Sequence, residues 1–212
     1  MLATESMKLW PSSDTDQILR QGISLLPNLV ADLPHKSAVT KVALSPDARD
    51  LVTVSDGRVF VWELPDGSGG SQPAREQNAV SHESAALTVA ISPNGKYLLT
   101  GGLDGEVRIF EFPSGRSLLG RMEIEAKITD ILPTPDSRYF ITRSSSPTVF
   151  VGQRPDGRKI GSLPHEDRVI SLSMSHDGTR LCTGTEKGDV SLWNWRSRRC
   201  CADSQLLARS RV

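Results

Sequence analysis

The stretch SAALTVAISPNGKYLLTGGLDGEVRIFEF, residues 84–112, contains the pattern that decides the fold. Apolar residues alternate with small or polar ones over 86–91, which is typical of a β-strand with one buried face. The pair Asn94-Gly95 favours a tight turn, because both residues accept a positive φ. A second apolar segment follows, then a turn at Asp104-Gly105 and a third alternating segment. The stretch therefore predicts a three-stranded antiparallel meander.

Three further stretches, 37–64, 126–154 and 167–195, repeat this order of strand, turn, strand ending near a Thr, turn and strand. The anchors of the first turn lie 47, 42 and 41 residues apart. A period of roughly 40 to 45 residues is expected for β-propeller blades of four strands each. A small blade cannot bury both faces alone, so the blades must stack on their neighbours. The four anchors are Pro46, Pro93, Pro135 and His176.

The region from residue 35 to about residue 200 resembles the WD-repeat family. That family has a hydrogen-bonded tetrad of a loop His, a second-strand Ser or Thr, a turn Asp and a third-strand Trp. In the stretch 37–64 and the loop just before it, the matching positions are His35, Thr53, Asp56 and Trp62. The resemblance implies that these side chains are structural. In the repeat around 84–112 the matches are His82, Thr100 and Asp104, and Phe110 stands at the Trp position. In the repeat around 167–195 the matches are His165, Thr183 and Trp193, and Lys187 stands at the Asp position.

The third stretch departs furthest from the family pattern. It retains only Thr142, while Ser146, Pro147 and Gly152 stand at the turn Asp, turn Gly and Trp positions. We expect this blade to be the least rigid. A sandwich or an up-and-down barrel would also have many short strands and turns. Neither gives a reason for a loop His to recur before three of the four meanders.

We therefore predict an all-β chain of WD-type β-propeller blades, four repeats that form an incomplete or half propeller, with a short N-terminal helical segment. The helical head covers residues 1–27, the blades 28–200 and the tail 201–212. The segment 28–33 is expected to be an outer blade strand, because 28–39 parallels 159–170 and both contain Leu-Pro-His. The blades are expected at about 35–64, 82–112, 126–154 and 165–195.

The junction between the head and the first blade has a resemblance of its own. Helical composition followed by Leu25-Leu26-Pro27 and a blade strand is similar to the junction in bacterial STAND-type or NACHT signalling proteins, in which helices precede a C-terminal propeller. The resemblance implies a bacterial origin and the sensor end of a larger protein.

Composition narrows the functional classes. Lys plus Arg equals Asp plus Glu at 25 each, so no global field draws the chain to nucleic acid or to an anionic membrane. No apolar run approaches the length of a membrane span, and the first residues lack the pattern of a signal peptide. The three cysteines do not form a disulfide framework. We expect a cytoplasmic protein that binds other proteins.

Motifs for catalysis or cofactor binding are not found in the sequence. Three histidines occupy tetrad positions and His176 stands in a turn, so no metal site is expected. Neither GxxxxGK[ST] nor GxSxG occurs, and no cofactor is expected. Carboxylates recur about once per blade, as turn chemistry requires, whereas an acid–base pair needs two carboxylates in different environments. We therefore expect no catalytic residues.

A protein-interaction scaffold or sensor module is the function that the sequence favours, because propeller repeats expose loops around a rigid framework. An alternative is a nucleic-acid-associated propeller that uses the arginine-rich tail, 196–211, although a solvated terminus explains that tail more simply. A propeller enzyme is less favoured, since no His and carboxylates converge at the inner strands. The residues expected to contact a partner are Lys36, Glu83, Leu103, Asp167, Glu186 and Lys187.

The ends of the array predict self-association, as a homodimer or with blades of a parent chain. An open array would expose apolar faces on its first and last blades, and large exposed apolar patches mark interfaces. The residues expected on these faces are Val42, Leu44, Val52 and Val54 at one end and Ile170, Leu172, Leu181 and Leu192 at the other.

Overall fold

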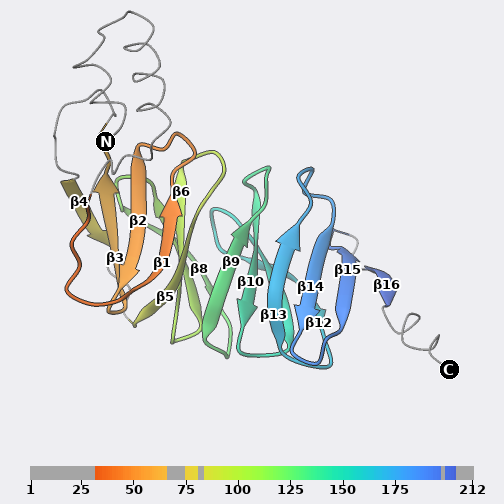
Figure 1. Ribbon diagram of the computed structural model, residues 1–212. Helices are drawn as coiled ribbons and strands as arrows, with labels where there is room; N and C mark the ends of the chain where they lie inside the picture. Colours follow the sequence, from red (N-terminus) through yellow and green to blue (C-terminus); the bar gives the residue numbers. More distant parts are fainter. Residues whose placement is uncertain (1–31, 66–74, 81–83, 197–198, 204–212) are drawn as a thin grey trace, which may run out of the picture. The chain divides into compact units, whose positions relative to one another are not determined.

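The computed structural model describes residues 32–65, 75–80, 84–196 and 199–203 (Figure 1). These residues form sixteen β-strands and no helix, arranged as four four-stranded antiparallel sheets. Each sheet consists of four consecutive strands in meander order. The all-β prediction is therefore confirmed. The predicted helical head at 1–27 lies outside the described residues. Within the described part of the chain, no helix is long and apolar enough to span a bilayer.

The strands have the following bounds. The first sheet contains β1 (Val39–Leu44), β2 (Asp50–Ser55), β3 (Arg58–Glu63) and β4 (Arg75–Val80). The second contains β5 (Ala86–Ile91), β6 (Tyr97–Gly102), β7 (Glu106–Glu111) and β8 (Ser117–Glu123). The third contains β9 (Ile128–Pro133), β10 (Tyr139–Ser144), β11 (Thr148–Gln153) and β12 (Lys159–Pro164). The fourth contains β13 (Val169–Met174), β14 (Leu181–Thr185), β15 (Val190–Asn194) and β16 (Arg199–Asp203).

The fourth strand of each sheet lies in the connection between two meanders. In the connection after the first meander, β4 pairs with β3, with Val80 opposite Val59. Similarly, β16 pairs with β15 at the start of the tail. Of the outer strand predicted at 28–33, residues 28–31 lie outside the described chain, and the last two residues are in no strand.

The same turn closes the first two strands of every sheet. In the first sheet the Ser45 hydroxyl donates to the Asp47 carboxylate at 2.6 Å and accepts from the amide of Asp50 at 2.9 Å. In the fourth sheet the hydroxyls of Ser175 and Thr179 and the Thr179 amide donate to Asp177, which lowers the pKa of this carboxyl to about 2. These carboxylates are therefore structural. The other two turns use Ser92 with Asn94 and Thr134 with Asp136.

The four sheets bury their apolar side chains against one another. Strand β5 contacts β1 on one side and β9 on the other, and β10 contacts β13 (Figure 1). We call the side of a sheet that packs on the preceding sheet its leading face, and the side that packs on the following sheet its trailing face. In the second sheet, Leu98 on the leading face joins the core with the first sheet, and Leu99 on the trailing face joins the core with the third. Side chains alternate between faces because the strand period is two residues.

The apolar residues expected on exposed faces of the first and fourth sheets are only partly exposed. Val52 and Val54 are fully buried, because they point to the trailing face of the first sheet and pack against the second. Leu181 is fully buried, because it points to the leading face of the fourth sheet and packs against the third. Leu172 and Leu192 are half-buried. The residues that are exposed as expected are Val42, Leu44 and Ile170.

The third sheet has a glycine at the Trp position of its third strand and a large side chain beside it in its second strand. Gly152 stands at the Trp position of β11, and its partner in β10 is Phe140. In the second sheet the same pair is Phe110 with Leu98. The Phe140 ring is fully buried and fills the space above Gly152, where an added Cβ would lie about 2.1 Å from the Phe140 Cζ atom. A large side chain in the second strand thus replaces a large one in the third.

This exchange predicts strong coupling between the two positions. We expect Gly152→Ala to destabilise the protein by roughly 1 to 3 kcal/mol through overpacking, and Phe140→Ala by about 3 to 5 kcal/mol through a cavity. The double variant Phe140→Leu/Gly152→Phe copies the second sheet and should be more stable than Gly152→Phe alone. Urea melts of these variants and of Phe140→Leu alone complete the comparison, and strictly additive free energies in the double variant would contradict the exchange.

Candidate functional site

A chain of side-chain hydrogen bonds lies on the leading face of the first sheet. The Trp62 Nε1 group donates to Thr53 Oγ1 at 2.9 Å, and Thr53 Oγ1 lies 2.8 Å from His35 Nε2. His35 Nδ1 lies 2.8 Å from the carbonyl oxygen of Leu33. Because a carbonyl only accepts, His35 Nδ1 donates to the Leu33 oxygen. In the neutral ring, Nε2 then accepts the Thr53 hydroxyl, which itself accepts from Trp62.

The fourth sheet repeats this chain. Trp193 Nε1 donates to Thr183 Oγ1 at 3.0 Å, Thr183 Oγ1 lies 2.7 Å from His165 Nε2, and His165 Nδ1 lies 3.0 Å from the Leu163 oxygen. The His165 and Trp193 rings meet edge to face with centroids 5.1 Å apart. Burial lowers the pKa of His165, although its backbone hydrogen bonds act in the opposite direction. Both chains connect the second and third strands of a sheet to the segment that enters it.

The carboxylate expected in the first tetrad is not part of this chain. Asp56 has φ 52° in the two-residue turn between β2 and β3, its side chain is exposed, and it makes no hydrogen bond to the described residues. The Leu33 carbonyl satisfies His35 Nδ1 instead. The tight Asp56-Gly57 turn explains the difference, since both residues adopt a positive φ and the Asp serves the turn. In the fourth sheet, Lys187 at the equivalent position is also exposed.

The second and third sheets lack the complete chain. His82 lies outside the described residues, and Phe110 has no ring N–H to donate, so the buried Thr100 hydroxyl finds no partner in the described part of the chain. The Asp104 carboxylate instead accepts the amide of Glu106 at 3.0 Å. In the third sheet Thr142 donates to the Phe150 carbonyl at 3.4 Å.

The contrast between sheets predicts opposite effects of the same substitution. We expect Thr53→Val to cost about 1 to 3 kcal/mol, because it leaves the buried Trp62 N–H and His35 Nε2 without a partner. Thr100→Val should be near neutral or stabilising, since the buried hydroxyl that it removes has no hydrogen-bond partner among the described residues. Denaturant melts of both variants compare the two. Equal losses would show that the hydrogen-bond chain does not stabilise the first sheet.

Burial of His165 predicts a pH dependence of stability. Below pH 6.5, the reference value of the pKa, the unfolded chain takes up a proton that the folded His165 binds only at lower pH. The free energy of unfolding should therefore fall as pH drops from 8 through 6.5 toward the folded pKa. His165→Gln should reduce this fall, and His176→Gln, an exposed His in a turn, serves as the control. Identical pH profiles of wild type and His165→Gln would contradict it.

The turns between the second and third strands gather at one end of the sheets. Backbone hydrogen bonds link each of the first two turns to the segment that follows its sheet. The Ala86 amide donates to the Gly57 oxygen at 2.9 Å, and the Ile124 amide donates to the Gly105 oxygen at 2.9 Å.

Among the residues expected to contact a partner, Lys36, Glu186 and Lys187 are exposed and Asp167 is half-buried. Leu103 is 52% exposed. Glu83 lies outside the described residues.

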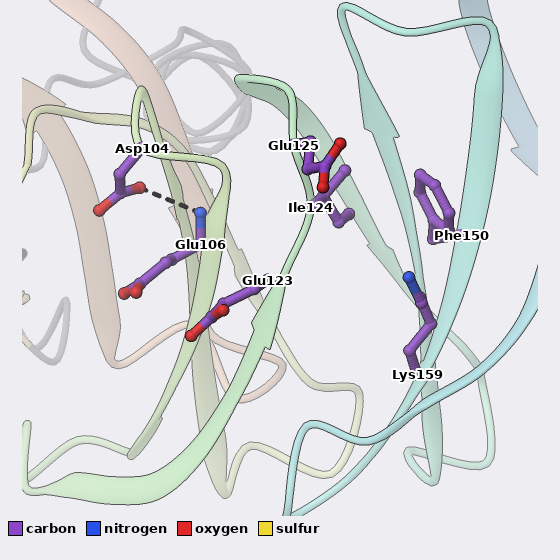
Figure 2. Close-up of a pocket in the computed structure, with 7 residues that line it drawn as sticks. All are labelled: Asp104, Glu106, Glu123, Ile124, Glu125, Phe150 and Lys159. Atoms are coloured by element: carbon purple, nitrogen blue, oxygen red, sulfur yellow. Dashed lines mark hydrogen bonds between the residues drawn. The ribbon is translucent and has the colours of Figure 1, made fainter.

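A cavity of about 720 Å³ opens beside the Leu103 turn, between the second and third sheets (Figure 2). Four carboxylates line it, and Figure 2 shows Phe150 and Lys159 across from Asp104 and Glu106. The Lys159 ammonium lies 4.9 Å from the centre of the Phe150 ring. We call this cavity the acidic groove. Its lining residues are Asp104, Glu106, Glu123, Ile124, Glu125, Phe150 and Lys159.

Two arginines partly balance the acidic groove. Glu106 accepts from Arg108 Nη2 at 2.7 Å and lies 3.6 Å from Arg121 Nη1. Arg121 also lies 3.3 Å from Glu123. Arg121 and Glu123 are well exposed, so their pairing contributes little to stability. Carboxylates that are held in place but remain accessible suit the ammonium and guanidinium groups of a second protein.

Sequence reasoning named the neighbourhood of this groove but not the groove itself. It singled out Leu103 beside the groove and Asp104 in its wall. It missed Phe150, Lys159 and the alternating acids of Glu123-Ile124-Glu125, although that short motif is readable in the sequence. Of the other named positions, Lys36, Asp167, Glu186 and Lys187 do not line the groove.

Metal binding and nucleic-acid binding by the arginine-rich tail are two other kinds of site to compare with the described residues. No group of three or more His, Cys, Asp or Glu side chains there could hold a metal ion. In the arginine-rich tail, Arg196 pairs with Asp136 at 2.8 Å and lies over the Trp195 ring. Arg198, Arg209 and Arg211 lie outside the described residues.

Comparison with known proteins agrees with this geometry. The family model described as "WD domain, G-beta repeat" matches residues 28–63, 75–111 and 157–194, about half of the chain. Two of these segments begin at the last strand of one sheet and continue into the next sheet, and the first three strands of the third sheet are not matched. Two similar proteins are MST50-interacting protein 11 of Pyricularia oryzae and small ribosomal subunit protein RACK1 of Neurospora crassa. Each is 25% identical over 182 residues, which cover 80% of this chain and 55% of the relative. The chain therefore spans about half the length of these relatives.

Proposed function

The chain belongs to the WD-repeat family, and from this premise we propose that it is a non-catalytic scaffold or sensor module that holds other proteins. The observation that carries the proposal is the acidic groove beside the exposed Leu103 turn. The groove and turn are carried by sheets whose side chains are committed to packing, which leaves the turns to vary and bind. One relative is named as an interacting protein and the other as a protein of the small ribosomal subunit. Both names describe proteins that associate with other macromolecules, which supports the same class of function here.

The partner segment that fits the groove carries Lys or Arg next to an apolar residue. Cationic groups complement the carboxylates of Glu123 and Glu125, both of which are exposed. An apolar side chain complements Leu103 and the Phe150 ring. Nucleic acid is disfavoured at this surface, because its phosphates would meet the same carboxylates.

Further parts of the proposal concern the setting of the chain. We propose a cytoplasmic location, which the free thiol of Cys182 supports. A role at the sensor end of a larger bacterial signalling protein rests on the head segment at 1–27, outside the described residues, although the two relatives above are fungal. The proposed partners include blades of the same kind, in a second copy or in a parent chain.

A charge-reversal pair tests the groove. Glu123→Lys/Glu125→Lys should weaken binding of a captured partner at least tenfold, about 1.4 kcal/mol, because it places cations where the partner presents cations. The matched control Glu63→Lys/Glu76→Lys makes the same charge change on exposed residues of the first sheet. The partner is isolated from the native host with wild-type protein, and its Kd is then measured by calorimetry. Equal Kd values for both pairs, or no saturable partner, would refute the proposal.

A further inference from the structure

The acidic groove carries a positive charge as well as its four carboxylates. Lys159, the first residue of β12, is exposed, and its ammonium lies 4.9 Å from the centre of the Phe150 ring. The electron-rich face of an aromatic ring attracts a cation at this distance. The ammonium forms no ion pair with a carboxylate of the described residues. It can therefore bind a carboxylate of another protein without breaking an ion pair in this chain.

Glu125 offers the opposite charge in the same groove. Its side chain is exposed and follows buried Ile124 in the connection between β8 and β9. In the part of the chain that the structure describes, no Lys or Arg forms an ion pair with it. Glu125 and Lys159 line one cavity of about 720 Å³, yet they do not pair with each other. The groove thus holds an unpaired anion and an unpaired cation apart, with space between them.

The remaining charges of the groove nearly cancel. Four carboxylates line it, and three cations, namely Lys159 and the two arginines that pair with Glu106 and Glu123, lie in or beside it. A surface with so little net charge attracts a uniformly charged partner only weakly. Its selectivity depends on where the unpaired charges lie. Glu125 follows the last strand of the second sheet, whereas Lys159 belongs to the third sheet, across the groove (Figure 2).

We infer that the acidic groove binds a partner segment of mixed charge, in which an ammonium or guanidinium group pairs with Glu125 and a carboxylate pairs with Lys159. A purely cationic segment fits less well, because it would leave Lys159 facing a like charge. The same two residues fix the direction of the segment, since turning it around would bring like charges together. The inference rests on the proposed function and deepens it, because it adds an acidic residue to the chemistry that the partner must carry.

Selection from a phage-displayed library of random short peptides tests this charge order without a known partner. Peptides enriched on the wild-type chain should contain Lys or Arg and, at a constant spacing from it, Asp or Glu. Selection on Lys159→Glu should retain the cation and lose the acidic residue, because two carboxylates would then meet. The matched control Lys96→Glu alters an exposed Lys in the turn between β5 and β6 and should return the wild-type pattern.

Calorimetry with a synthetic peptide from the wild-type selection tests the ion pair itself. Lys159→Gln should weaken its binding about two- to fivefold, as expected for one exposed ion pair. Lys159→Arg should bind like wild type, since it keeps the charge. A peptide with its acidic residue changed to the amide should bind wild type and Lys159→Gln equally, because the ion pair is already lost. Lys159 is exposed, so an unchanged far-UV spectrum is expected for each variant.

Two results would overturn the inference and leave the proposed function standing. Enriched peptides that carry Lys or Arg without an acidic residue at a constant spacing would show that the groove takes a purely cationic segment. Tighter or equal binding of the peptide to Lys159→Gln would show that Lys159 does not pair with its carboxylate. The proposed function fails separately, if Glu123→Lys/Glu125→Lys still selects the same cationic peptides. A selection that enriches no peptide would overturn both.

Discussion

The packing of one sheet face on another is the constraint on which the whole structure depends. Each sheet has apolar side chains on both faces, because its strands alternate between Val, Leu or Ile on one side and similar residues on the other. Four short strands cannot cover two such faces, so a sheet is stable only between neighbours. The three cores between sheets follow from this requirement. Val42 in the first sheet and Val190 in the fourth are exposed, because each lies on a face on which none of the four described sheets packs.

Burial of both sheet faces also removes polar side chains from water, and the sheets differ in how these side chains are hydrogen-bonded. The hydroxyls of Thr53 and Thr183 are buried, and each is hydrogen-bonded to a Trp N–H donor and to a His ring. Thr100 is equally buried, but its hydroxyl has no partner in the part of the chain that the structure describes, and Phe110 and Leu98 of the same sheet belong to an apolar core. The third sheet replaces the chain by placing Phe140 over Gly152. The repeats therefore reach the same packing with different amounts of hydrogen bonding.

Because the strands are committed to packing, the turns carry the features that can recognise a partner. The turn that contains Leu103 projects beside the acidic groove, whose walls come from strands of two sheets and from the connection at 124–125. The groove therefore depends on how the second and third sheets stack. A substitution in their shared core, such as one at Phe140, would alter the groove without touching a residue that lines it.

The sequence by itself determined the four meanders, their turns and the His-Thr-Trp positions, because strand alternation, turn chemistry and a period of about 40 residues are local properties. It did not reveal that Leu33 replaces Asp56 as the partner of His35, since a backbone carbonyl leaves no trace in the residue pattern. It also missed the exchange between Phe140 and Gly152, because a repeat alignment compares equivalent positions and not cross-strand neighbours. Only the tertiary structure decided which apolar residues of the end sheets are exposed and which seven residues form the groove. Both depend on which face of a strand packs on another sheet. Strand pairing and sheet stacking decide this between residues far apart in the chain, and the alternation within one strand does not show it.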